Sequence, residues 1–363
     1  MRTLLLLWLF VAPGADTLQV MFWNVENFFD WRNDSTTVSD VEFSAAGERH
    51  WTWKRFQAKA NAFAKALFWV EAETGRLPDI IGLEEVENAF VLRQVLQKTA
   101  LRKLDYKYVH YDSPDRRGID VALLYRSSRL ELLDSKPCHL FAADTVMATR
   151  DILLCVFRRA VSPVLSDPAS FVMPDHDRAS IATVLEIPGQ AGNDGRGRAG
   201  NDGKDRAGQD GAFAVLVNHH PSKYGGAAES EPRRRIAVER LRFLADSLAA
   251  VGIDRIIAGG DFNDTPDNPV FRLLEPALMP THMDLHRRGL GTIKYDGQWD
   301  LIDHIYLSPG WGASSMRILR IPFLLTRDTV HSGEKPLRTF QGPRVLGGVS
   351  DHLPVLLEVV SGP

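Results

Sequence analysis

Residues 255–266 read RIIAGGDFNDTP, an apolar run that ends in two aspartates and an asparagine. Short apolar runs followed by turn-forming residues are typical of buried strands, and α/β folds place their sites at such strand ends. The same pattern recurs in residues 18–29 (LQVMFWNVENFF), 80–88 (IIGLEEVEN), 118–126 (GIDVALLYR), 212–220 (AFAVLVNHH), 299–308 (WDLIDHIYLS) and 349–360 (VSDHLPVLLEVV). This repetition predicts a fold with several buried strands whose polar ends meet.

Two longer segments carry apolar residues at helical spacing. Residues 53–72 (WKRFQAKANAFAKALFWVEA) alternate apolar and charged residues as an amphipathic helix does. Residues 232–250 predict a second helix, in which Ser230 would be the N-cap and Pro232 would lie in the first turn. Strands and helices together predict a layered α/β fold.

The composition is that of an ordinary globular protein. The chain has 363 residues, of which 44% are hydrophobic and 25% charged, and its net charge is -3. Such a charge excludes a protein that coats nucleic acid or anionic membranes by bulk electrostatics, although a local basic patch stays compatible with it. Because no long linker divides the apolar segments, we expect one domain over residues 18–361.

The first residues, MRTLLLLWLFVAPGAD, predict a secretory signal peptide over residues 1–15. Arg2 precedes an apolar run that is too short to span a bilayer, and Pro13, Gly14 and Ala15 follow it. The alternative is a buried first strand, since Pro13 is unusual at its place before a cleavage site. The first interpretation predicts export, to the periplasm or out of the cell, and we expect no stable association with a membrane.

Two cysteines, Cys138 and Cys155, exclude a disulfide-rich scaffold. In an oxidising compartment they could form one bridge, and two buried free thiols are the equal alternative.

A polar repeat occupies residues 189–211, GQAGNDGRGRAGNDGKDRAGQDG. It lacks the apolar residues needed to form a core, so we expect a flexible loop between two strands. A calcium-binding repeat is the alternative suggested by its Asn-Asp-Gly units, but the ligand spacing of such repeats differs.

The residues at the strand ends are carboxylates, amides and imidazoles. This inventory suits a hard, oxygen-seeking cation such as Mg²⁺ or Mn²⁺, and the imidazoles could exchange protons with a reacting phosphate. The sequence has no nucleophile elbow, no glycine-rich phosphate loop and no CxxC pair. The members are Asn24, Glu26, Glu84, Glu85, Asp120, His219, His220, Lys223, Asp261, Asn263, Asp264, Asp300, Asp303, His304, Asp351 and His352.

In order, the motifs NVENFFD, IIGLEEVEN, TRDILL, VNHHPSKYGG, GGDFNDTP, DLIDHIYLS and GGVSDHLPV resemble those of the DNase I-like endonuclease/exonuclease/phosphatase superfamily. The resemblance extends from Asn24 to the Ser-Asp-His near the C-terminus. It implies a four-layer α/β sandwich, in which two central sheets are flanked by helices.

The resemblance also implies roles for individual residues. Metal ligands would be Glu85, Asn24 and Asp351, binding Mg²⁺ or Mn²⁺, with Ca²⁺ as an alternative. Substrate would be bound by Asn24, Arg150 and Lys223. The implied catalytic residues are His219, Asp261, Asn263, Asp303, which would orient the last histidine, and His352.

Three positions depart from the superfamily pattern. Glu84 replaces the commoner glutamine, His220 stands where an aromatic residue is typical, and Lys223 replaces an arginine. Glu84 would either add negative charge near the metal or face away from it. Lys223 offers a point charge instead of a bidentate fork, so we expect it to hold a phosphate less tightly.

Together these features predict a metal-dependent phosphodiester hydrolase that uses in-line attack of water. We expect an exported, monomeric endonuclease with DNA or RNA as substrate. The alternatives are a phosphodiesterase or phosphatase of small or lipid phosphoesters, and a non-catalytic binding protein on the same fold.

Overall fold

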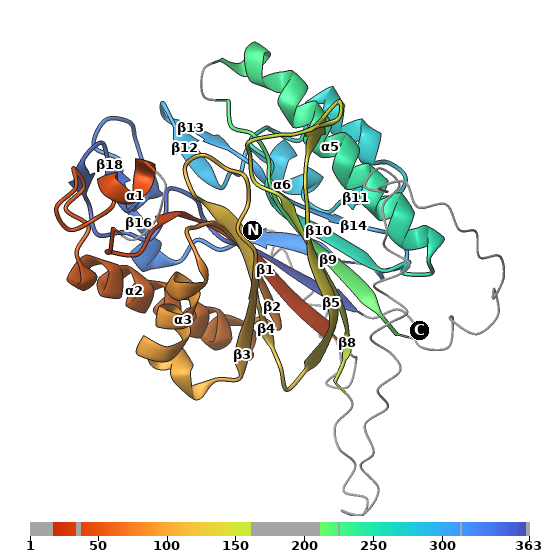
Figure 1. Ribbon diagram of the computed structural model, residues 1–363, viewed down its shortest axis with the longest axis horizontal. Coiled ribbons are helices and arrows are strands. Elements are labelled where there is room, and N and C mark those ends of the chain that lie inside the picture. The colour runs from red at the N-terminus through yellow and green to blue at the C-terminus, as the bar shows by residue number, and fades with distance from the viewer. Residues whose placement is uncertain (1–16, 34–37, 161–210, 224–225, 313, 361–363) are drawn as a thin grey trace, which may run out of the picture.

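Two six-stranded sheets pack face to face and helices cover their outer faces (Figure 1). The computed structural model describes residues 17–33, 38–160, 211–223, 226–312 and 314–360. The expected four-layer α/β sandwich is therefore confirmed. The predicted signal peptide, and the repeat loop except for its last residue, lie outside the described residues.

The first sheet has the order β15-β20-β1-β2-β4-β3, in which β1 and β2 are parallel. Its outer face is covered by α2 (Trp53–Thr74) and α3 (Ala89–Lys98). The strands are β1 (Thr17–Phe28), β2 (Ile80–Val86), β3 (Tyr106–His110), β4 (Asp120–Arg126), β15 (Ser315–Ile318) and β20 (Val355–Val360).

The second sheet has the order β11-β14-β10-β9-β8-β5, in which β9 and β10 are parallel. The helix α5 (Ala227–Ala250) and the 3₁₀ turn η2 (Pro269–Leu274) pack on its outer face. The strands are β5 (Leu130–Cys138), β8 (Ile152–Arg159), β9 (Phe213–His219), β10 (Ile256–Asp261), β11 (Met279–Pro280) and β14 (Asp303–Leu307).

Short elements surround one end of the sandwich. The hairpin of β12 (Ile293–Tyr295) and β13 (Gln298–Asp300) lies between β11 and β14 in the chain, and the hairpin of β18 (Phe340–Gln341) and β19 (Arg344–Val345) precedes β20. The remaining elements are α1 (Val38–Glu42), η1 (Ala100–Lys103), β6 (Phe141–Ala142), β7 (Thr145–Val146), α6 (Met283–Arg287), η3 (Pro322–Leu324), β16 (Leu325–Arg327) and β17 (Glu334–Pro336).

Successive side chains of β1 point to opposite faces of the sheet and therefore pack in two different hydrophobic cores. Met21, Trp23 and Val25 pack against the helices, whereas Val20 and Phe22 face the opposite sheet. The Phe22 ring lies between the sheets against two glycines, because a Cβ added at Gly82 or at Gly259 would come within 2.3 Å of it. These glycines set how closely β2 and β10 approach each other.

The two predicted helices are present, with one change of boundary. The helix α2 begins at Trp53, where the Thr52 side chain accepts a hydrogen bond from Arg55 N, and ends before Gly75. The helix α5 begins at Ala227, which is earlier than the sequence predicted. The prediction of Ser230 as its N-cap is therefore wrong: the Ser230 hydroxyl donates back to the Gly226 carbonyl oxygen at 2.7 Å, inside the first turn.

Cys138 and Cys155 are both buried free thiols, which decides between the two alternatives. The described helices include none with the length and apolar character required to cross a bilayer.

Candidate active site

The ends of strands from both sheets bring the predicted site residues together. The first sheet contributes Asn24 from β1 and Glu85 from β2, with Asp351 and His352 just before β20. In the second sheet, Asp261 at the end of β10 pairs in register with His219 on one side and with Asp303 on the other. These positions are far apart in the sequence, and only the packing of the two sheets makes them neighbours.

The Asp261 carboxylate lies at the centre of this group. Its Oδ2 accepts a hydrogen bond from Asn24 Nδ2 at 3.0 Å, and its Oδ1 accepts one from Asn263 N at 2.8 Å. Two imidazoles approach the same Oδ2, His219 Nε2 at 3.6 Å and His352 Nε2 at 3.9 Å. One buried carboxylate thus contacts or faces four groups that the sequence analysis had placed in one site.

His352 is held by a second buried carboxylate. Its Nδ1 lies 2.9 Å from Asp303 Oδ2, and Thr292 Oγ1 donates a hydrogen bond to the same oxygen. Thr292 belongs to the chain just before β12, and Ile293 forms a bridge with His352. The ring of His352 is therefore fixed both by its acid partner and by the backbone beside it.

The two imidazoles beside Asp261 have opposite pKa shifts. Burial, and then the charge of Arg150, lowers the pKa of His219 well below its usual value. Burial alone would also lower the pKa of His352, but the charges of Asp303 and Asp261 outweigh it and raise that pKa well above its usual value. Near neutral pH, His352 is therefore the charged imidazole and His219 the neutral one.

Glu85 lies at an irregularity in β2, where the pairing with β4 shifts register. Its φ is 64°, and Glu26 and Asn27 opposite it have φ values of 45° and 48°, so three neighbouring residues adopt the left-handed region. This conformation costs free energy for residues other than glycine and is common at functional sites. Glu85 Oε2 accepts a hydrogen bond from Asn27 N at 2.8 Å, and its Oε1 lies 3.9 Å from His219 Nε2.

The oxygen atoms of Glu85, Asn24 and Asp351 fit a hard divalent cation. Asn24 Oδ1 accepts a hydrogen bond from Glu26 N at 2.9 Å, which orients the amide and leaves its second lone pair. Asp351 Oδ2 pairs with Arg338 Nη2 at 2.8 Å, so its other oxygen is the one available to a metal. The donors are carboxylate and amide oxygens, the ligand types that Mg²⁺ and Mn²⁺ prefer.

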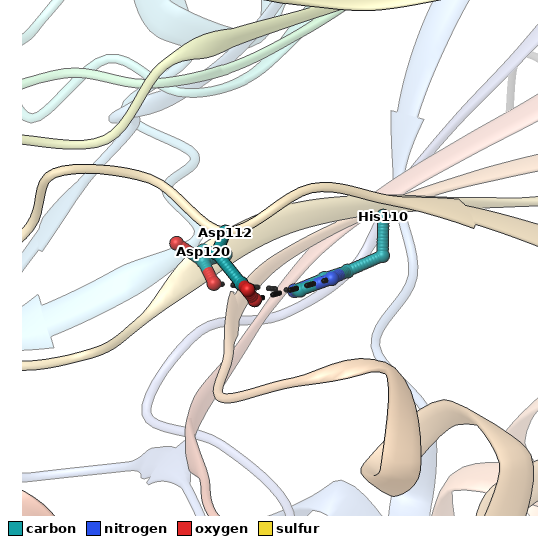
Figure 2. A group of neighbouring side chains, drawn as sticks. All are labelled: His110, Asp112 and Asp120. Carbon is teal, nitrogen blue, oxygen red and sulfur yellow. Dashed lines mark ion pairs between the residues drawn. The ribbon is translucent and has the colours of Figure 1, made fainter. Parts of the chain in front are cut away.

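A second group of metal-type ligands contains Asp120 from the predicted set and two residues that the sequence did not indicate. Of the described residues, His110, Asp112 and Asp120 are the three whose potential ligand atoms all lie within 4.8 Å of one another. Figure 2 shows the His110 ring directed at both carboxylates; Nε2 lies 3.2 Å from Asp120 Oδ2, and Nδ1 lies 3.9 Å from Asp112 Oδ1. His110 ends β3 and Asp120 begins β4, beside the end of β2 that carries Glu85.

The two cations predicted to bind substrate both have acidic partners. Arg150 is buried, with Nη1 3.0 Å from Asp115 Oδ2 and Nη2 donating to the His220 carbonyl oxygen at 2.6 Å. Lys223 is more exposed, and its Nζ lies 2.6 Å from Asp264 Oδ1. Arg150 thus lies near His219 in space, and Lys223 lies near it in the chain. A bound substrate would have to compete with Asp115 and Asp264 for these two cations.

Two departures from the superfamily pattern have structural explanations. His220 is a core residue, since its ring packs in a tilted arrangement against Phe262, with the ring centroids 4.5 Å apart, and burial lowers its pKa to about 3. Glu84 is fully buried between the sheets, where its Oε1 would lie 2.7 Å from a Cβ at Gly260. Burial, and then the charges of Asp303 and Asp261, raises the pKa of Glu84 well above its usual value. A protonated Glu84 has nearly the shape and charge of the glutamine that it replaces.

Three residues around the site were not found by the sequence analysis in these roles. Glu26 accepts hydrogen bonds from Thr339 N at 2.6 Å and Phe340 N at 3.2 Å, and Arg338 pairs with both Glu26 and Asp351. Lys59 in α2 is buried and donates to the Glu26 carbonyl oxygen. Glu26 was indicated only as a polar residue at a strand end, and the signal for Lys59 is its helical phase between Phe56 and Phe63, which points it toward the core.

Comparisons with known proteins agree with this architecture. The sequence profile of the Endonuclease/Exonuclease/phosphatase family matches residues 19–160 and 207–361. None of the curated proteins matches the sequence.

Solved structures share the fold at low identity. A family protein from Bacteroides thetaiotaomicron has a TM-score of 0.53 at 16% identity, covering 96% of this chain and 99% of the other. The catalytic domain of human Nocturnin, with a bound sulfate anion, has a TM-score of 0.53 at 16% identity, covering 95% of each chain. A mannosyl-6-phosphatase of B. thetaiotaomicron VPI-5482 has a TM-score of 0.51 at 15% identity, covering 94% and 99%.

Proposed function

Since the chain belongs to the Endonuclease/Exonuclease/phosphatase family, we propose that it hydrolyses phosphodiesters by in-line attack of water, with DNA or RNA as its substrate. The observation that supports this reaction best is the pair of imidazoles beside Asp261. One is charged and the other neutral, so a phosphate bound between them would meet a proton donor on one side and a proton acceptor on the other.

Asp261 is the group that we assign to the attacking water. Burial raises its pKa, which makes the carboxylate a stronger base, and its hydrogen bonds to Asn24 and Asn263 fix its orientation. His219, 3.6 Å from the same carboxylate, is the alternative base. Asn263 would act beside this water, since its Nδ2 donates to Asp261 Oδ2 at 3.3 Å and to the His220 carbonyl oxygen at 3.0 Å and so helps to orient the carboxylate.

His352 would donate a hydrogen bond or a proton to the phosphate as negative charge develops on its oxygens. The Asp303 carboxylate accepts a hydrogen bond from Nδ1 of the charged ring, so the protonated Nε2 faces the reacting centre. Asp303 thus acts through His352 and needs no contact with the substrate.

Glu85, Asn24 and Asp351 would hold Mg²⁺ or Mn²⁺, with Ca²⁺ as an alternative. When bound, such an ion polarises the phosphoryl oxygens and stabilises the leaving oxygen. Asn27 N and the Arg338 guanidinium keep the two carboxylates in place through the hydrogen bonds described above.

Nucleic acid as substrate is supported by the loop between β3 and β4. Arg116 and Arg117 are exposed there, and Arg117 lies close enough to His219 to contribute to the lowering of its pKa. A nucleic acid backbone entering the site would therefore pass cationic side chains. A related zebrafish structure is described as a complex with single-strand DNA product.

Small phosphoesters are the second candidate. Several cationic side chains near the site already have acidic partners: Arg235 Nε lies 2.8 Å from Glu239 Oε1, Arg234 Nε lies 3.2 Å from Asp264 Oδ2, and Lys223 pairs with Asp264. A small substrate would need no basic track, and one fold neighbour is a mannosyl-6-phosphatase.

We also propose that residues 1–15 direct export, because of the apolar run behind Arg2. Expression of the full chain and of a chain without residues 1–15, followed by cell fractionation, tests this. Equal distribution of the two proteins would contradict it. Gel filtration of the purified protein tests the expectation of a monomer.

Hydrolysis is tested with supercoiled plasmid DNA, single-stranded RNA, bis(p-nitrophenyl) phosphate and p-nitrophenyl phosphate, each with Mg²⁺, Mn²⁺ or chelator. Asp261→Asn should lose the activity, and Asp254→Asn, at the opposite end of β10, should keep it. Cleavage of polynucleotide supports the nuclease, and turnover of only the small esters supports the second candidate. Inactivity on all four would favour a binding protein.

A further inference from the structure

A buried lysine lies behind the proposed metal site. Lys59 projects from α2 and is 2% exposed, in a region lined by aromatic rings. Its Nζ lies 4.9 Å from the centroid of Phe28, 5.8 Å from that of Phe340 and 6.0 Å from that of Trp51. Burial of an ammonium group is costly, so its place in the core calls for a specific partner.

The partner is a backbone carbonyl group. Lys59 Nζ donates a hydrogen bond to the Glu26 carbonyl oxygen, which belongs to the peptide group joining Glu26 to Asn27. The N–H of that same peptide group, on Asn27, donates to Glu85 Oε2 at 2.8 Å. Lys59 and Glu85 thus hold the two ends of one peptide dipole, with the ammonium at its negative end and the carboxylate at its positive end.

This peptide group lies in a strained irregularity of β1, where the pairing with β2 shifts register. Glu26 and Asn27 have φ values of 45° and 48°, a conformation that neither residue adopts without cost. Hydrogen bonds at both ends of the peptide group oppose its rotation toward a relaxed conformation. The neighbouring bonds act in the same direction, because Asn24 Oδ1 accepts from Glu26 N at 2.9 Å.

We propose that Lys59 is a positioning residue for the metal site: it holds the Glu26–Asn27 peptide group so that Asn27 N fixes the carboxylate of Glu85. The inference rests on the proposed assignment of Glu85 as a metal ligand. Lys59 itself touches neither metal nor substrate. It acts on the ligand through one peptide group, as outer partners of metal ligands commonly do.

If Lys59 acted only through its charge, removing it would change the affinity for a metal ion in the opposite direction from the loss of a positioning residue. Burial lowers the pKa of Lys59 to about 7, and the charges of Glu26, Glu85 and Asp351 oppose this shift, so the ammonium form is near enough to these acids to repel a cation bound there. Removing a positive charge from this neighbourhood would then strengthen the binding of Mn²⁺. If the lysine instead positions Glu85, its removal weakens binding, so the sign of the change separates the two roles.

The test is calorimetric titration of Mn²⁺ into the wild-type chain, Lys59→Met and Lys65→Met, without substrate. Lys65 is the matched control, because it is on the same helix, exposed, and its Nζ lies over the Phe323 ring at 4.2 Å. We expect Lys59→Met to weaken Mn²⁺ binding by about 10- to 100-fold, the usual effect of losing an outer partner of a metal ligand. Lys65→Met should leave it unchanged.

A second substitution tests the mechanism. Glycine adopts positive φ without strain, so Asn27→Gly added to Lys59→Met should recover part of the lost affinity. Unchanged or tighter Mn²⁺ binding in folded Lys59→Met, or no recovery in the double variant, would overturn the inference. If Lys59→Met does not fold, Lys59→Arg replaces it, with weaker binding again expected and unchanged binding again contradictory.

The outcome is separable from the proposed function. Mn²⁺ binding without hydrolysis of any phosphoester would overturn the proposed function and leave Lys59 testable. A wild-type chain that binds no Mn²⁺ would overturn this inference, whatever it hydrolyses.

Discussion

His352 Nδ1 and Asp303 Oδ2 lie 2.9 Å apart, and both side chains are buried. This ion pair joins the last motif of the chain to the strand next to β10, and it keeps the imidazole charged near neutral pH. The charge of His352 therefore depends on a residue that need not meet the substrate.

Asp303→Asn should lower the turnover number by about 10²- to 10⁴-fold, because the imidazole loses both its charge partner and the acceptor that sets its tautomer. His352 would also deprotonate more easily in this variant. As the pH is raised, the rate should therefore begin to fall at a lower pH than in the wild type. Asp296→Asn, which is exposed in the turn between β12 and β13, is the control. A wild-type profile in Asp303→Asn would refute the assigned role.

Divalent metal should stabilise the protein through Glu85. At a concentration 100 times its Kd, a ligand of the native state adds about 2.7 kcal/mol to the free energy of unfolding. We expect Mn²⁺ to raise the melting temperature of the wild type and of His110→Asn, but not that of Glu85→Gln. The opposite pattern would place the ion at His110, Asp112 and Asp120.

His282 should make the protein sensitive to acid. Burial lowers its pKa to about 4, whereas the unfolded chain binds the proton near the ordinary value. Protonation of His282 therefore favours the unfolded chain. The free energy of unfolding keeps its full value, as far as this group is concerned, above about pH 6.5. It decreases as the pH falls toward 4, by up to about 3 kcal/mol for a fully buried group.

Urea unfolding of the wild type and of His282→Phe at pH 7 and pH 4.5 checks this. The variant should lose less stability between the two pH values. An equal loss in both proteins would assign the acid sensitivity to other groups.

Cys138 and Cys155 should react with a thiol reagent only when the protein is unfolded. Both are buried, and burial raises the pKa of the Cys138 thiol to about 11, which keeps it protonated and unreactive. Titration with Ellman's reagent should give two thiols in denaturant and none in native buffer. A reductant should leave the melting temperature unchanged, and a decrease would indicate a disulfide.

Strong local patterns made most of the fold predictable. Apolar runs with polar ends identified β1, β2, β4, β9, β10, β14 and β20, and helical spacing identified α2 to within two residues of its end. The start of α5 was missed because Ser230 and Pro232 imitate a helix start. Here the longer helix outweighed the local cap signal, which is common where a segment packs on a sheet.

The site was predictable where residues follow strands, and less so where tertiary contacts decide their role. The sequence grouped Asp261, His219 and His352 by motif, and the structure brings Nε2 of each imidazole within 4 Å of Asp261 Oδ2. It could not show that Asp115 pairs with Arg150 or that Arg338 pairs with Asp351, since these partners lie in loops without a periodic pattern.

The Phe22 ring packs against Gly82 in one sheet and Gly259 in the other, so its contacts are complete only when the two sheets have docked. Neither sheet carries the whole proposed site, because Glu85 and Asn24 belong to one sheet while His219 and Asp261 belong to the other. Each sheet could form its own hydrogen bonds during refolding and still be inactive. Recovery of hydrolysis during refolding would then report the docking of the two sheets. A phosphate bound by residues of both sheets would stabilise the docked state.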